Sequence, residues 1–326
     1  MVKVNLCIDG NYILYKCVFI LRQTRSIDGD LEDLLHIEFN KMIRSYEFDN
    51  IYFVSDMGAS WRKDLFTTYK EGRKKDDKID WENVFNIFDS FKDELEARND
   101  VNMYQLKKVE GDDIIAYIVN QSNNIGYSNI IIASDKDLHQ LLKFDLNNNY
   151  INVMWNFKTS DERTYLPENY QIFFDSIEST SSGEFDLFEE NDFDGDFINF
   201  LEGLATRTKS FEINNEEALF TKIVSGDNSD KIPSIFKRNG RGYGEKGAAK
   251  VYKMYKDIYT EPIDFNGDDF LRKLVGVVAY DKKFDDNTEK KVVYLNAKDN
   301  RLLIKLDEIY MPGYLYGLMK NKIEII

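Results

Sequence analysis

The 326-residue chain contains only two cysteines and two histidines, so it has little of the side-chain chemistry that works near neutral pH. Cys7 and Cys17 lie in apolar contexts without metal-ligand spacing, and we interpret them as reduced core residues of a cytosolic protein. His36 and His139 lie in helix-like apolar patterns and are interpreted as structural. Acid–base chemistry is therefore expected from carboxylates, lysines or metal-bound water.

Long apolar segments are also missing. No run approaches the roughly 18 residues that a membrane-spanning helix needs. Residues 1–9 lack the cationic and small-residue flanks of a signal peptide, so secretion is not expected. A hydrophobic content of 43% with 14% aromatic residues supports a globular fold of one large domain or two ordinary ones.

Cations are outnumbered, with a net charge of -15 and a pI near 4.8, which argues against binding nucleic acid by overall charge. The charge is nevertheless sorted by segment. Residues 231–256 contain many lysines and arginines and one acid, Glu245, whereas residues 184–196 contain many acids and no cation. The distribution therefore leaves room for a local anion-binding surface.

The first half of the sequence alternates strand and helix patterns. Short apolar runs rich in Val, Ile and aromatic residues, typical of buried parallel strands, occur at 2–8, 50–55 and 129–133. Helix-period stretches lie between them, and the clearest is 81–98. This alternation predicts an α/β domain with a parallel central sheet flanked by helices.

Acidic residues stand where the predicted strands end. Asp9, Asp56 and Asp135 follow the three runs, and sites in open α/β sheets form just beyond the carboxyl ends of strands. More acids lie nearby: Glu110, Asp112, Asp113 and Asp137. Helix capping explains such acids singly but not together, because like charges about 5 Å apart repel by roughly 3 kcal/mol at an effective dielectric near 20. Oxygen ligands without His or Cys select Mg²⁺ or Mn²⁺, and paired ions of this kind cleave phosphodiesters.

A basic segment, 59–78, follows Asp56 directly. Its cations include Arg62, which we expect to contact DNA, although a solvated helix face explains several of its lysines equally well. Lys70 is expected to lie close to a scissile phosphate, and Tyr69 beside it is a candidate platform for base stacking.

A second segment, 223–256, joins two acids to a glycine-rich turn and several cations. Asp227 and Asp230, three residues apart near a helix start, can complete a second metal position. The turn is expected to bring backbone N–H groups to a phosphate at the start of the following helix. The residues expected to contact DNA here are Arg241, Gly242, Gly244, Lys246, Lys250 and Lys253. The match to G-x-G-x-x-G has no preceding strand, so a dinucleotide site is not expected.

Taken together, these pieces resemble the flap endonuclease family of 5′ nucleases, and particularly its phage ribonuclease H and 5′-3′ exonuclease branch. In family order they are IDGN, SDMGASWRKDLFTTYKEGR, VEGDD, SDKDLHQLL, and SGDNSDKIPSIF followed by GYGEKGAAK. The resemblance implies a PIN-like or resolvase-like parallel sheet flanked by helices, with a helical arch at about 60–100. It also implies a mainly helical C-terminal region that contains a helix-three-turn-helix.

The resemblance further implies roles for individual residues. A first metal group would be Asp9, Asp56, Glu110, Asp112 and Asp135. A second would be drawn from Asp137, Asp227 and Asp230, with Asp113 nearby. Lys70 and Arg73 would be catalytic cations at the base of the arch, and the helix-three-turn-helix would hold duplex DNA and a K⁺ ion.

The implied activity is that of a Mg²⁺-dependent structure-specific 5′ nuclease with two ions, for which Mn²⁺ can substitute. It would act as 5′-3′ exonuclease, flap endonuclease and ribonuclease H, for RNA primer removal in phage DNA replication. The expected partners are branched or nicked duplex DNA and RNA–DNA with 5′ ends or flaps, and a single-strand-binding protein or sliding clamp. A monomer in the host bacterial cytoplasm, without membrane contact, is expected.

Three units are expected: a nuclease domain over 1–160, an acidic insertion or linker over 161–217, and a DNA-binding domain over 218–326. The acidic stretch is interpreted first as a linker, with a partner-binding element and an electrostatic gate as alternatives. The segment FKRNGR adds residues to a turn that is shorter in the family.

Two alternative functions are a different phosphohydrolase and a DNA-binding protein without catalysis. A phosphohydrolase of the haloacid-dehalogenase type needs a second acid two residues after the first, but Asp9 is followed by Gly10 and Asn11. A family member that only binds branched DNA would be expected to have lost some of the acids, whereas the full set is present.

Overall fold

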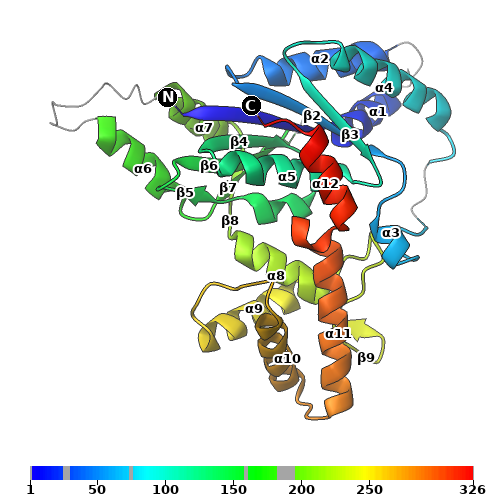
Figure 1. Ribbon diagram of the computed structural model, residues 1–326, viewed down its shortest axis with the longest axis vertical. Coiled ribbons are helices and arrows are strands. Elements are labelled where there is room, and N and C mark those ends of the chain that lie inside the picture. The colour runs from blue at the N-terminus through cyan, green and yellow to red at the C-terminus, as the bar shows by residue number, and fades with distance from the viewer. Residues whose placement is uncertain (1, 25–29, 73–75, 158–160, 182–194, 326) are drawn as a thin grey trace.

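The computed structural model describes residues 2–24, 30–72, 76–157, 161–181 and 195–325. Its centre is a twisted sheet with strand order β3-β2-β1-β4-β6-β7-β8 (Figure 1). The strands are β1 (Lys3–Asp9), β2 (Asn50–Met57), β3 (Asn102–Lys107), β4 (Tyr127–Ile132), β6 (Tyr150–Asn156), β7 (Arg163–Pro167) and β8 (Lys209–Ile213), and β5 (Phe144–Asp145) pairs with β6. β3 to β6 pair in parallel along this order, while β7 runs antiparallel to β6. The expected parallel central sheet is therefore confirmed, and β7 and β8 are added at one edge in the opposite direction.

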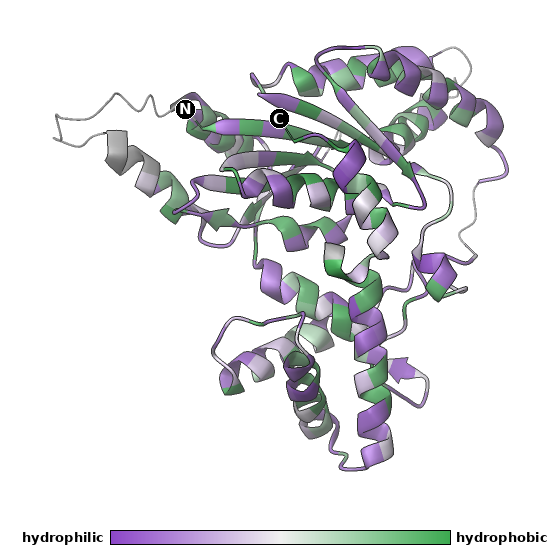
Figure 2. Ribbon diagram, in the orientation of Figure 1, coloured by the Kyte–Doolittle hydropathy of each residue, from purple (hydrophilic) through white to green (hydrophobic). Residues whose placement is uncertain are grey.

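Helices cover both faces of the sheet. One face carries α1 (Gly10–Thr24), α2 (Leu31–Ile43), α4 (Trp81–Glu96), α6 (Tyr170–Ser181) and α7 (Gly195–Arg207). The other carries α5 (Gly111–Asn123), the short helix η1 (Lys136–Leu141) and α12 (Gly313–Lys322). Figure 2 shows hydrophobic residues along the strands and on the helices that cover them, as burial of both sheet faces requires.

A helical part lies beside this sheet layer and has its own core. It contains α8 (Asn215–Ser225), α9 (Glu245–Ile258), α10 (Asp268–Lys282), α11 (Asn287–Ile304) and the hairpin β9 (Lys237–Arg238) and β10 (Arg241–Gly242). The segment FKRNGR forms that hairpin, and its turn residues Asn239 and Gly240 have φ values of 54° and 77°. Asn-Gly is the pair that a two-residue turn with positive φ at both positions favours.

The amphipathic stretch at 81–98 folds as predicted. Asp80 is the N-cap of α4, and its side chain accepts a hydrogen bond from the Asn83 N–H at 3.1 Å. Its apolar face, from Val84 to Leu95, is buried against the sheet. The hydrophobic periodicity and the N-cap therefore indicate the same position for this helix.

A row of asparagines, three of them buried and Asn50 half-buried, crosses four adjacent strands. Asn50, Asn5, Asn129 and Asn152 are in register on β2, β1, β4 and β6. Each side-chain amide donates to the next side chain, at 3.0, 3.2 and 2.9 Å, and Asn152 donates to the Leu141 carbonyl at 3.0 Å. A slip of one residue would break every bond in the row, so the row specifies the register of the sheet.

Two segments differ from the predicted division of the chain. The described part of 161–217 is not a linker, because β7 and β8 extend the sheet and Phe173 and Phe197 lie in its core. Residues 182–194, which hold most of the acidic stretch, lie outside the described residues. At the other end, α12 leaves the helical part and packs Leu315 and Met319 against the sheet layer. Within the described ranges, no helix combines the length and apolar character needed to cross a bilayer.

Candidate active site

The acids expected at the strand ends come together at one edge of the sheet. Asp9 is the last residue of β1, and Asp135 follows the neighbouring strand β4. Asp56 stands near the end of β2, and its carboxylate accepts the Gly111 N–H at 2.6 Å, where α5 begins. Asp112 is in the first turn of α5. The strand order reverses between β1 and β4, and this is the position where open α/β sheets form ligand sites.

The pKa values of these acids show that they share one environment. Burial, followed by the charges of Asp56 and Asp135, raises the pKa of Asp9 to about 7. Burial also raises the pKa of Asp112 well above its usual range, followed by the charges of Asp135 and Asp9. Among the described residues, no lysine or arginine forms an ion pair with any of these four acids.

Glu110 differs, because cations surround it. Arg62 Nη1 lies 2.7 Å from Glu110 Oε2, Lys70 Nζ pairs with Oε1, and the Tyr69 hydroxyl donates to Oε2 at 3.1 Å. Burial alone would raise the pKa of Glu110, but the charges of Arg62 and Lys70 outweigh it and lower the pKa to about 2. Glu110 therefore stays ionised and fixes the position of Lys70 beside the acid group.

Arg62 and Tyr69 are not DNA contacts in this structure. The Arg62 side chain is 2% exposed, and it donates to both oxygens of Asp113 at 2.8 Å and to the Leu303 carbonyl at 2.8 Å. Tyr69 is 5% exposed and packs in the core of the helical part. Both predictions were wrong, because α3 (Arg62–Leu65) and the turn after it fold inward over Glu110.

Asp113 is likewise taken up by the protein. Besides Arg62, its carboxylate accepts from Trp61 Nε1 at 3.0 Å. Consecutive helix residues face different directions, so Asp112 and Asp113 cannot both reach the acid group. Because this rule needs only the sequence, it could have predicted that Asp112 and Asp113 have different surroundings.

The second predicted acid group is bridged by a lysine that the sequence did not reveal. Lys222 of α8 pairs with Asp227 and lies 2.7 Å from Asp137 Oδ1, in ion-pair range without hydrogen-bond geometry. Burial, followed by the charge of Asp135, raises the pKa of Asp137 to about 6, and the effect of Asp135 links the two acid groups. Asp230 connects this second group to Lys70, because its backbone carbonyl accepts the Lys70 backbone N–H at 3.0 Å. No sequence signal marks Lys222, because only the docking of α8 on η1 brings it to Asp137.

A cavity of about 480 Å³ leads from this second group to the start of α9. Its lining includes Lys136 and His139 of η1, Lys222 and Asp227, and Gly244 with Lys246. Gly244 is the N-cap of α9 without a side-chain cap, and a Cβ there would meet open space. Free N–H groups at a helix start with lysines beside them can bind a phosphate.

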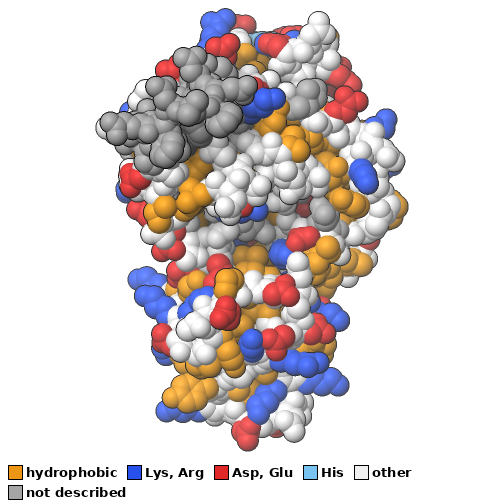
Figure 3. Space-filling model, turned by 60° about the vertical axis from the view of Figure 1, so that its left-hand side comes forward, with side chains coloured by type: hydrophobic (Ala, Val, Ile, Leu, Met, Phe, Trp, Pro, Cys, Tyr) orange, Lys and Arg blue, Asp and Glu red, His pale blue; other side chains and the backbone are white. Residues whose placement is uncertain are grey.

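The remaining predicted DNA contacts divide into two kinds. Lys246, Lys253 and Arg241 are exposed, and Figure 3 shows Lys and Arg side chains on the helical part. Lys250 is exposed but paired with Asp281 at 2.8 Å. Gly242 differs from its prediction, because a Cβ there would lie 2.6 Å from Ser234 Cβ, so tight packing of the turn explains this glycine. Arg73 lies outside the described residues.

The donor set of the first group fits a divalent ion. Asp9, Asp56, Asp112 and Asp135 offer only carboxylate oxygens, which suit hard cations. The raised pKa values of Asp9 and Asp112 show that this group lacks the compensating charge that Glu110 and Asp227 have. A positive charge bound where the acids meet would therefore lower these pKa values and stabilise the ionised carboxylates.

The chain thus joins a parallel sheet with an acid-lined edge to a helical part with an open helix start. The comparison with known families identifies it further. The model of the 5′-3′ exonuclease N-terminal resolvase-like domain matches residues 4–171, and the chain belongs to this family of 5′ nucleases.

Similar proteins of known name support this family assignment. The chain is 24% identical to a 5′-3′ exonuclease of Mycoplasmopsis pulmonis over 302 residues, which cover 90% of this chain and 80% of that protein. It is 26% identical over 273 residues to DNA polymerase I of Chloroflexus aurantiacus, covering 79% of this chain but only 23% of the polymerase. It is 33% identical over 114 residues to the ribonuclease H of Enterobacteria phage T4, covering 33% and 37% of the two chains.

A solved structure shows the same fold over the whole chain. The phage T5 5′-exonuclease with bound zinc ions is 14% identical and covers 99% of both chains, with a TM-score of 0.60. By the family match and the sequence relatives, the chain is a hydrolase of phosphodiester bonds in the 5′-3′ exonuclease family. The expected fold class is confirmed, and the haloacid-dehalogenase alternative is wrong.

Proposed function

We propose that this chain is a divalent-metal-dependent, structure-specific nuclease that uses Mg²⁺ and cleaves at 5′ ends and 5′ flaps. The observation that carries the proposal is the meeting of Asp9, Asp56, Asp112 and Asp135 at one sheet edge, without a paired cation among the described residues. Bound divalent ions would lower the pKa of water and neutralise charge on the phosphate.

The residues around this edge have separate proposed roles. The four acids, with Glu110 beside them, would hold one ion, and Asp137, Asp227 and Asp230 would hold a second. Lys70, fixed by Glu110 and by the Asp230 carbonyl, would contact the scissile phosphate. Lys222 compensates Asp137 and Asp227 in the absence of an ion, since its ammonium contacts both.

The substrate path is proposed from the cavity. It joins Asp227 to the start of α9, so a duplex strand could lie along it with a phosphate at Gly244 and Lys246. The cavity walls come from both the sheet layer and the helical part, which would fix the distance between the gripped phosphate and the cleaved one. The phage T5 flap endonuclease, which has a similar fold, has been solved in complex with DNA and metal ions.

The cellular role is proposed as RNA primer removal in phage DNA replication, acting on branched or nicked DNA and RNA–DNA hybrids. The similarity to a phage T4 ribonuclease H over 114 residues supports it. A K⁺ ion at the helix-three-turn-helix, a clamp or single-strand-binding partner, a monomeric state and a place in the host cytoplasm stay predictions.

Cleavage of an end-labelled 5′-flap duplex tests the proposal. The wild-type chain should cut near the junction with Mg²⁺ and stop when EDTA is added. Asp135→Asn should lose cleavage by at least about 100-fold while gel-shift binding of the flap in EDTA is kept. Asp93→Asn, an exposed acid of α4, is the matched control and should cleave like the wild type. Cleavage that persists in EDTA, or undiminished in Asp135→Asn, contradicts the proposal.

A further inference from the structure

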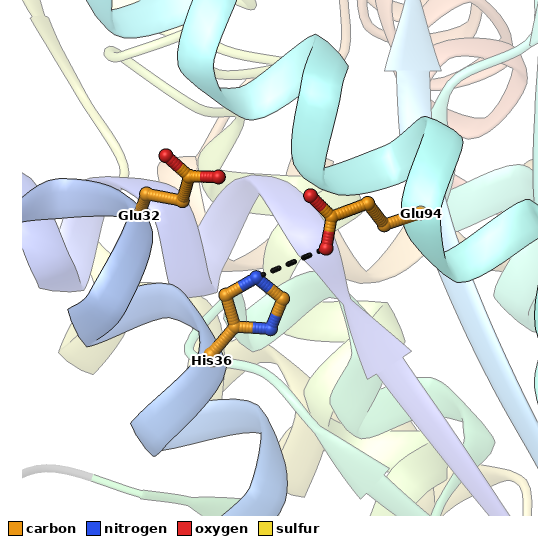
Figure 4. Close-up of side chains that lie close together, drawn as sticks. All are labelled: Glu32, His36 and Glu94. Carbon is orange, nitrogen blue, oxygen red and sulfur yellow. Dashed lines mark ion pairs between the residues drawn. The ribbon is translucent and has the colours of Figure 1, made fainter.

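A second cluster of potential metal ligands lies on α2 and α4, outside the proposed active site (Figure 4). Glu32, His36 and Glu94 each offer one ligand atom, and these atoms all lie within 4.8 Å of one another. Within the described part of the chain, this is the one such group of three. No three described acids of the active site have ligand atoms that all lie this close together.

The backbone builds this cluster from two helices. Glu32 and His36 are four residues apart on α2, and residues at this spacing point to the same side of a helix. Glu94 comes from α4, which packs against α2. His36 Nε2 lies 3.2 Å from Glu94 Oε2, and Figure 4 shows all three side chains turned toward one space.

Packing restricts the imidazole. The His36 ring meets the buried ring of Phe91 edge-on, with centroids 5.0 Å apart and an interplanar angle of 78°. The contact limits rotation of the ring while Nε2 stays directed at Glu94. Glu32 has no hydrogen bond or ion pair with any described residue, so its carboxylate is available to a ligand.

The mixed donor set selects a different ion from the active site. One imidazole nitrogen with two carboxylates suits Zn²⁺ and other borderline divalent ions, whereas oxygen-only sites suit Mg²⁺. Two carboxylates also balance the charge of one divalent ion. Both cysteines are buried and therefore do not compete for zinc.

We propose that Glu32, His36 and Glu94 bind one Zn²⁺-class ion that links α2 to α4. The ion would leave its remaining coordination positions to water, since three protein ligands do not complete a tetrahedron. This site is independent of the proposed nuclease function. Its effect would be a cross-link between two helices that cover the same sheet face, which stabilises their packing by mass action.

Zinc binding to the full chain tests the proposal. Equilibrium dialysis against Zn²⁺ would be run in the Asp135→Asn background with millimolar Mg²⁺ present, so that zinc binding by the oxygen-only site is weakened. His36→Gln and Glu94→Gln should each weaken binding about 10-fold or more. Asp33→Asn removes the same charge from the neighbouring exposed position of α2 and should bind zinc like the wild type.

Nuclear magnetic resonance separates this site from every other one, because the chain has only two histidines. Zinc should shift the imidazole nitrogen resonances of His36 and leave those of His139 in place. Unchanged zinc affinity in His36→Gln, or zinc binding without a shift at His36, would overturn the proposal. Circular dichroism of each variant confirms that the helices are intact, so that weakened binding reports on the ligands.

Discussion

Replacing Arg62 with methionine should destabilise the protein strongly, although the sequence presents Arg62 as one cation in a basic stretch. The guanidinium makes four contacts of 2.7 to 2.8 Å, to Glu110, to both oxygens of Asp113 and to the Leu303 carbonyl. Removing one partner of such a buried pair leaves uncompensated charge and costs about 3–5 kcal/mol. We therefore expect the free energy of unfolding of Arg62→Met to fall by about 4 kcal/mol.

Urea unfolding followed by far-UV circular dichroism in EDTA measures this loss. Lys63→Met, at the next, exposed position of α3, is the matched control and should change stability by less than about 0.5 kcal/mol. The double variant Arg62→Met/Asp113→Leu should recover at least half of the loss, because both buried charges leave together. A loss under about 1 kcal/mol, or a double variant no more stable than Arg62→Met, would refute the buried-pair argument.

Three further results are expected. Asp112→Asn should abolish Mg²⁺-dependent cleavage yet stabilise the metal-free protein by about 1–3 kcal/mol in urea titrations, since it removes one of several repelling charges. Because the folded pKa of Asp9, about 7, lies above its ordinary 3.8, the metal-free protein should lose stability as pH rises from about 4 through 7. The rise in melting temperature on adding Mg²⁺ should therefore be larger at pH 8 than at pH 5.5, and an equal rise at both would contradict this sign. Asn129→Leu should cost about 2–3 kcal/mol in urea unfolding, because it leaves the side-chain N–H of Asn5 and the side-chain oxygen of Asn152 without the partner that Asn129 supplies.

The sequence predicted those parts of the fold that local patterns encode. The runs that became β1, β2 and β4 are apolar and β-branched, and α4 shows both its period and its cap. β7 and β8 were missed, because their burial depends on partners elsewhere in the sheet rather than on their own alternation. α12 was missed for the same reason, since its apolar residues face the distant α5.

The candidate site was predictable where topology alone brings residues together. Asp9, Asp56 and Asp135 follow parallel strands, so their convergence needs only the strand order. The roles of Arg62, Tyr69 and Lys222 depend on side-chain direction after packing, and a count of cations along the sequence carries no such information. A basic residue beside a strand that carries an active-site acid can therefore pair with buried acids instead of contacting the substrate.

The last turn of α11 acts on both acid groups at once. Its Leu303 carbonyl receives Arg62, while the Ile304 carbonyl and the Leu306 N–H hold the Gln140 amide at 3.1 and 2.9 Å. Gln140 in turn donates to the Asp137 carbonyl at 2.7 Å. A shift of this one helix end would thus move the supports of Glu110 and Asp137 together, so a mutation 164 positions downstream of Gln140 could lower activity without contacting nucleic acid.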